Sequence, residues 1–81
     1  MMRRRELEKR YAFLVLFTIE LLSFKSGEIG RDLFFKKIES YIEQFFPEHK
    51  EEILNVVREQ VVMERIGDII GAIDDYLARI K

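Results

Sequence analysis

The sequence contains no cysteine, one histidine and one proline among its 81 residues. Without cysteine it can form neither a disulfide nor a thiolate metal site, and a reducing compartment is the natural expectation. The single histidine, His49, cannot build a metal site alone. We therefore expect a cytoplasmic protein with no bound metal and no other cofactor.

Long apolar runs are also absent. The longest uncharged segment extends from Tyr11 to Ile19 and is closed by Glu20. It is much shorter than the ~20 residues that a membrane-spanning helix needs. No small-residue cleavage site follows it, so we expect neither a membrane span nor a signal peptide.

Basic residues, by contrast, are concentrated at the start of the chain. The first ten residues hold five of the 14 Lys and Arg but only two acidic residues, in a chain of formal net charge −1. Local positive potential attracts polyanions, and the arginine fork meets phosphate oxygens two at a time. The segment therefore predicts nucleic-acid binding; a solvated terminus, with Glu6 paired to Arg10, is the alternative. The predicted nucleic-acid-binding residues are Arg3, Arg4, Arg5, Lys9 and Arg10.

Apolar residues recur at spacings of three and four throughout, which predicts a single all-α domain over residues 1–81. The first helix is expected from about Arg4 to Ser26, where Gly27 stops it. The second is expected from about Arg31 to Phe46, because Pro47 disfavours helical angles in the residue before it.

A third helical stretch is expected to begin at Pro47. Its apolar seam shifts by one residue near Val61, which leaves two alternatives: one long bent helix, or a break near Gly67 with Asp68 as N-cap. We expect the long helix, because a single glycine costs only about 1 kcal/mol in a helix. The fold class is thus a small bundle of three helices, or four if the break occurs.

The chain is rich in apolar side chains for its length, with 48% hydrophobic residues and seven Phe. The first helix is apolar almost all round. Its predicted buried stripe is Leu7, Tyr11, Leu14, Thr18 and Leu21, widened by Phe13, Leu16 and Phe17. A second copy of the chain could cover part of this surface, so a homodimeric interaction or structural domain is the alternative to nucleic-acid binding.

Catalytic constellations are not apparent in the sequence. The pairs Glu51-Glu52 and Asp74-Asp75 are adjacent, so on a helix their carboxylates point to different faces rather than converging. No serine has a companion set beyond His49 that could activate it. We therefore expect that the chain is not an enzyme, and that Glu20 pairs with a base on a neighbouring helix or borders a partner interface.

The first helix resembles the opening helix of the NusB transcription antitermination family, in which an arginine-rich start precedes Ala-Leu-x-x-Leu-Tyr/Phe-x-x-Glu-Leu. Two groups of residues carry the resemblance. In the first helix they are Ala12, Leu16, Phe17, Glu20 and Leu21, and near the C-terminal end they are Ile69, Ile73, Tyr76 and Leu77. The similarity spans most of this chain and the N-terminal half of the family's fold.

This resemblance implies a helical bundle similar to the N-terminal half of NusB. It also implies binding of single-stranded RNA through the basic N-terminal segment and pairing with a small-subunit ribosomal protein. On this basis the five basic residues named above would be the RNA-facing group.

Overall fold

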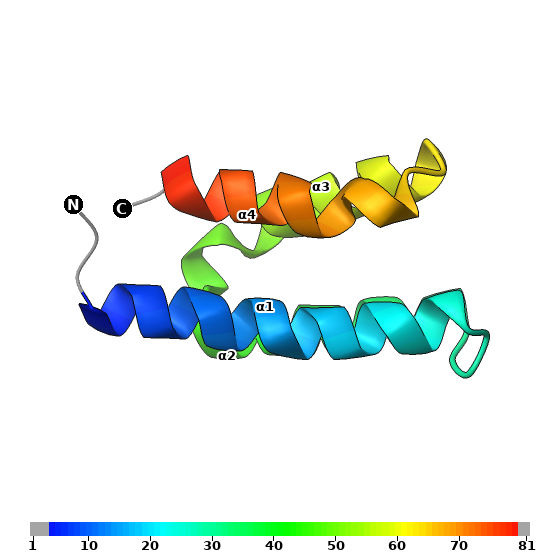
Figure 1. The fold of residues 1–81 in the computed structure, drawn as a ribbon, viewed down its shortest axis with the longest axis horizontal. Helices are drawn as coiled ribbons and strands as arrows, with labels where there is room; N and C mark the ends of the chain where they lie inside the picture. The colour runs from blue at the N-terminus through cyan, green and yellow to red at the C-terminus, as the bar shows by residue number, and fades with distance from the viewer. Residues whose placement is uncertain (1–3, 80–81) are drawn as a thin grey trace.

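The computed structural model describes residues 4–79, which form four α-helices (Figure 1). There is no β-strand within this range, so the prediction of an all-α bundle is confirmed. Short 3₁₀ turns, η1 (Pro47–His49) and η2 (Ile66–Asp68), precede the last two helices. The helices are α1 (Arg4–Lys25), α2 (Arg31–Phe45), α3 (Lys50–Val62) and α4 (Ile69–Arg79).

The helices form two antiparallel hairpins that pack on each other (Figure 1). Helices α1 and α2 make one hairpin, α3 and α4 make the other, and α1 also packs along α4. With 22 residues, α1 is about 33 Å long and spans most of the 37 Å length of the molecule. The start of α1 and the end of α4 lie at the same end of the molecule (Figure 1).

The predicted stop of the first helix at Gly27 is confirmed. Gly27 adopts φ of 83°, the left-handed conformation that glycine tolerates best. Its N–H donates to the carbonyl of Phe24, and the N–H of Glu28 donates to the carbonyl of Ser23. This pair of bonds is a Schellman motif, which satisfies carbonyls at the helix end and turns the chain toward α2.

The expected long third helix is wrong, because the chain reverses between α3 and α4. Glu64 has φ of 57°, and the N–H of Arg65 donates to the carbonyl of Gln60. This is a second Schellman motif, here with a glutamate in the left-handed position. It falls three residues before Gly67, where the sequence suggested a break, and α4 begins directly after Asp68.

Burial explains why the reversal is favoured. The seam of α3 is buried through Val61, whereas the next residue, Val62, is 78% exposed. Turning the chain back lets the second seam, Ile69, Ile73 and Leu77, bury against the same core. A straight helix would have carried these side chains away from it.

Aromatic rings form the centre of the core. Phe13 and Phe17 of α1 are fully buried, and the ring of Phe13 lies 5.4 Å from that of Phe46. At the other end, the rings of Phe24 and Phe34 stack at 4.6 Å. These rings join α1 to α2 and to the segment before α3. The other fully buried side chains include Ile38, Ile42, Ile53, Val57, Ile69 and Ile73.

The buried face of α1 agrees with the predicted stripe at Phe13, Phe17 and Leu21 and differs from it elsewhere. The residues that are buried are Phe13, Phe17, Glu20 and Leu21, whereas Tyr11 is 57% exposed. The sequence misplaces this face because it contains a glutamate, which normally marks the solvent side. In the folded chain Glu20 is buried beside them, and the core takes the side of the predicted stripe that carries Phe13 and Phe17.

Candidate functional site

The predicted RNA-binding residues are in several different environments. Arg3 lies outside the described residues. Arg4 Nε lies 3.2 Å from Glu8 Oε1, and both side chains are well exposed. Arg5 is exposed at the start of α1. The ammonium of Lys9 lies 4.8 Å above the centre of the Phe46 ring, a cation–π contact.

Arg10 is held inside the molecule by Asp74 of α4. Its Nε donates to Asp74 Oδ1 over 2.9 Å, and its terminal nitrogen also contacts this carboxylate oxygen and the backbone carbonyl of Asp74. The Arg10 side chain is only 17% exposed. Binding of Arg10 to phosphate would require breaking the pair with Asp74.

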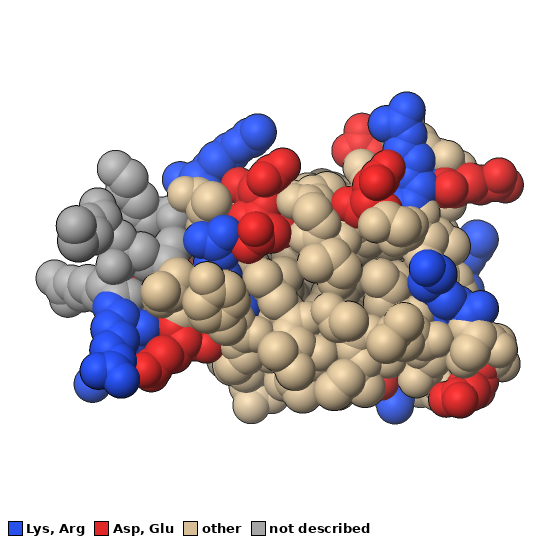
Figure 2. Space-filling model, in the orientation of Figure 1, with Lys and Arg blue, Asp and Glu red and all other residues tan. Residues whose placement is uncertain are grey.

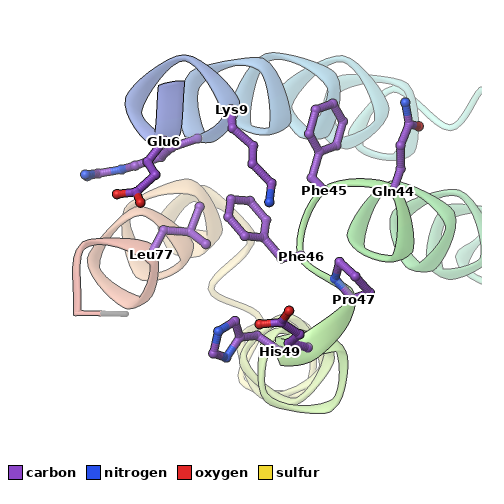
Figure 3. Close-up of a pocket in the computed structure, with 10 residues that line it drawn as sticks. Glu6, Lys9, Gln44, Phe45, Phe46, Pro47, His49 and Leu77 are labelled. Carbon is purple, nitrogen blue, oxygen red and sulfur yellow. The ribbon is translucent and has the colours of Figure 1, made fainter. Parts of the chain in front are cut away.

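A groove of about 400 Å³ lies beside this segment, where α1, α4 and the α2–η1 connection meet (Figure 3). Lys9 extends across it toward Phe46, and Leu77 of α4 closes one side (Figure 3). Lys9 and Arg10 bring positive charge to the lining, and Glu6 and Glu48 bring negative charge. This mixture gives the groove no preference for an anionic or a cationic ligand.

His49 is half-buried next to Tyr76 of α4. Its Nδ1 lies 3.4 Å from the Tyr76 hydroxyl, and the two rings meet edge to face. Burial raises the pKa of Tyr76, and the negative charge of Glu52 raises it further. Nothing in this pair resembles an activated nucleophile. Within residues 4–79 there is also no cluster of three or more acidic, histidine or cysteine side chains that could hold a metal.

Glu20 is paired with a base on a neighbouring helix, as one of the two alternatives for it predicted. Its carboxylate oxygens lie 3.3 and 3.5 Å from Nζ of Lys37 on α2. The Glu20 side chain is 6% exposed, while that of Lys37 is 42% exposed. The pair links α1 to α2 at the edge of the core, so the role of Glu20 here is to stabilise the packing of these two helices.

The largest unusual feature of the surface is a row of exposed apolar side chains on α1, which we name the α1 apolar face. It consists of Tyr11, Val15, Ile19 and Leu22, which are 57%, 59%, 54% and 59% exposed. Their spacings of four, four and three residues place them in one line along the helix. This line lies opposite the buried Phe13 and Phe17.

The space-filling view shows how this face is bounded. An uncharged surface covers the middle of the molecule over α1, and Lys, Arg, Asp and Glu gather toward the two ends (Figure 2). Glu8 lies three residues before the apolar row, with its side chain 67% exposed, and Lys25 lies three residues after it and is exposed. The α1 apolar face is thus flanked by an acidic residue at its N-terminal end and by a basic residue at its C-terminal end.

Sequence reasoning found the surplus of apolar surface on α1 but not the residues that form it. It assigned Tyr11 to the core and gave no role to Val15, Ile19 or Leu22. Their spacing of three and four residues was visible in the sequence. A helix that is apolar all round must leave one side uncovered in a small bundle, so one such row had to be exposed.

None of the helices in the described part of the chain is long and apolar enough to span a membrane. The chain matches no protein-family model, no curated protein and no solved structure. The resemblance to the NusB family therefore stays a prediction.

Proposed function

We propose that the chain is a protein-interaction module that docks through the α1 apolar face, and that it is not an enzyme. The observation that carries this proposal is the row of four apolar side chains on α1, each more than half exposed. An exposed, contiguous apolar row on a small domain is typical of a protein interface. The proposal places the chain in the cytoplasm, the compartment expected for a cysteine-free protein.

The chemistry of the row suits helix recognition. Side chains at i, i+4, i+8 and i+11 are the anchors with which an amphipathic helix lies in a groove or against another helix. Tyr11 adds an aromatic ring with a hydroxyl at its edge, and tyrosine is enriched among the residues that dominate binding energy. The ion pairs Arg10–Asp74 and Glu20–Lys37, each with one buried partner, hold α1 in the orientation that exposes this row.

Site-specific photo-crosslinking tests the proposal. Benzoylphenylalanine is placed at Val15, and in a control at Val62, in cells that naturally encode the chain. Val62 is a matched control because it is an equally apolar side chain, 78% exposed, at the end of α3. We expect protein adducts from position 15 upon irradiation and few from position 62. Equal or absent crosslinking at the two positions would contradict the proposal.

RNA binding is the second candidate function, and one observation favours it. Arg4, Arg5 and Lys9 project from the first two turns of α1, at the end of the molecule where α4, with Arg79 in its last turn, also ends (Figure 1). These cations could contact phosphates of a single strand, as the resemblance to NusB implies. Arg10 would take part only by leaving Asp74.

The salt dependence of binding tests this second candidate. If Arg4 and Arg5 each contact a phosphate, the affinity for a labelled single-stranded RNA should fall by about 0.7 log units per contact per log unit of salt. The double variant Arg4→Ala/Arg5→Ala should lose about two contacts from this slope. The control, Arg31→Ala/Lys36→Ala, removes the same charge from exposed positions on α2 and should keep the slope. No retention of RNA at low salt would exclude this function.

A further inference from the structure

We infer that the α1 apolar face binds α1 of a second copy of this chain, with the two helices antiparallel and Glu8 of each copy beside Lys25 of the other. This inference rests on the proposed function and names the partner. It gives a two-fold symmetric dimer, in which the same surface is used on both copies.

The positions of the charges along α1 indicate the antiparallel direction. The midpoint of the row from Tyr11 to Leu22 lies between Leu16 and Phe17. Glu8 precedes this midpoint by as many residues as Lys25 follows it, about 13 Å along the axis in each direction. When two such helices cross at their midpoints in opposite directions, each Glu8 is level with Lys25 of the other copy.

The apolar residues match in the same register. Tyr11 becomes level with Leu22 of the second copy, and Val15 with Thr18 and Ile19, so the row is covered along its whole length. Thr18 does not bring an unpaired hydroxyl to the interface, because its Oγ1 donates to the Leu14 carbonyl over 2.7 Å. The small, exposed Ala12 leaves room for the close approach of about 8–10 Å between helix axes.

A parallel pair is disfavoured by the same charges. It would place Glu8 beside Glu8 and Lys25 beside Lys25, and like charges across a helix interface favour the opposite direction. The antiparallel pair converts both repulsions into attractions. Arg4, which already contacts Glu8, extends each cluster to an Arg–Glu–Lys set in which the acid lies between two bases.

The first measurement is the mass of the purified chain in solution, by light scattering or sedimentation from micromolar to millimolar concentration. We expect twice the 9.8 kDa of one chain. Val15→Glu should raise the dissociation constant at least about a hundredfold, since it buries a charge at the crossing point. Val62→Glu, which makes the same change at another exposed valine, should leave it unchanged. A wild-type chain that stays monomeric at all concentrations overturns the inference.

Charge reversal then tests the direction. Glu8→Lys and Lys25→Glu should each weaken an antiparallel dimer about tenfold, because each places like charges together at both ends. The double variant Glu8→Lys/Lys25→Glu should recover the wild-type affinity. In a parallel dimer neither single variant weakens association, because like charges face each other before and after. Circular dichroism verifies that each variant stays helical.

Disulfide capture is an independent test of register, and the absence of native cysteine removes competing thiols. Tyr11→Cys and Leu22→Cys chains of different mass are mixed and mildly oxidised. The antiparallel dimer gives mainly the mixed product, in which position 11 of one chain is joined to position 22 of the other, whereas products that join two identical chains overturn the register. Adducts of position 15 with another protein in cells, together with a monomeric purified chain, would leave the interaction module intact and refute only the second copy as its partner.

Discussion

Arg10 and Asp74 are joined across 64 residues of sequence by a hydrogen bond of 2.9 Å from Nε to Oδ1. The pair fastens the first half of α1 to the middle of α4, and so one helical hairpin to the other. The Asp74 carboxylate takes two guanidinium nitrogens and stays 41% exposed, which limits its contribution.

We expect Asp74→Ala to lower the free energy of unfolding by about 1 to 2 kcal/mol, because Arg10 then loses its charged acceptor. Asp75→Ala is the matched control. It makes the same change in helix propensity and charge at the adjacent exposed position, and its effect should stay within about 0.5 kcal/mol of zero. Urea denaturation followed by circular dichroism measures both. Equal effects would show that the pair contributes nothing.

The Glu20–Lys37 pair predicts a non-additive response. Lys37→Met leaves the Glu20 carboxylate buried without its cation and should destabilise the fold by about 1 to 3 kcal/mol. Adding Glu20→Met replaces the ion pair with apolar side chains and should recover most of that loss. Lys36→Met, at the exposed neighbouring position, is the control and should be nearly neutral. Additive losses in the double-mutant cycle would refute the coupling.

The two left-handed helix ends predict opposite responses to glycine and alanine. Gly27→Ala should destabilise the protein by about 1 kcal/mol, because it places a side chain at φ of 83°. Glu64→Gly should stabilise it by up to about 1 kcal/mol, because it relieves the same conformation. Thermal unfolding measures both.

Gly71→Ala is the control for these variants. Gly71 lies inside α4 with open space around it, and alanine there should stabilise the helix by about 0.5 to 1 kcal/mol. If Gly27→Ala also stabilised the protein, the left-handed end of α1 would not be formed as described.

Tyr76 predicts a loss of stability at high pH. Its pKa is raised by burial and by Glu52, so near and above pH 10 the unfolded chain loses the phenolic proton before the folded chain does. The folded state then binds more protons, and the free energy of unfolding falls as pH rises through this window. Tyr76→Phe should remove this part of the slope, and Glu52→Gln should reduce it. Denaturation at a series of pH values, with ultraviolet titration of the tyrosines, measures the effect.

The sequence predicted the helices well where local chemistry decides their ends. Gly27 and Pro47 are residues whose backbone preferences end a helix by themselves, and both helix ends fall within one residue of the prediction. The reversal after α3 has no such local signal, because a glutamate occupies its left-handed position. The reversal is instead favoured by burial of the apolar seam of α4 against the core, which helix propensity does not predict.

The candidate site was less predictable than the fold. A cluster of basic residues is visible in the sequence, but the partner of Arg10 lies 64 residues away and only the fold brings it near. The uncovered row on α1 depends on which side of the helix the core takes. A glutamate usually marks the solvent side of a helix, but Glu20 lies on the core side, where Lys37 compensates its charge.

The order of the two hairpins has a kinetic consequence. The most extensive helix packing joins neighbours in sequence, α1 with α2 and α3 with α4, and such local topologies fold rapidly, in roughly microseconds to milliseconds. We expect the association of α1 with α4 to follow the formation of both hairpins. We therefore expect that removing the Arg10–Asp74 pair, as in Asp74→Ala, accelerates unfolding and leaves the refolding rate nearly unchanged.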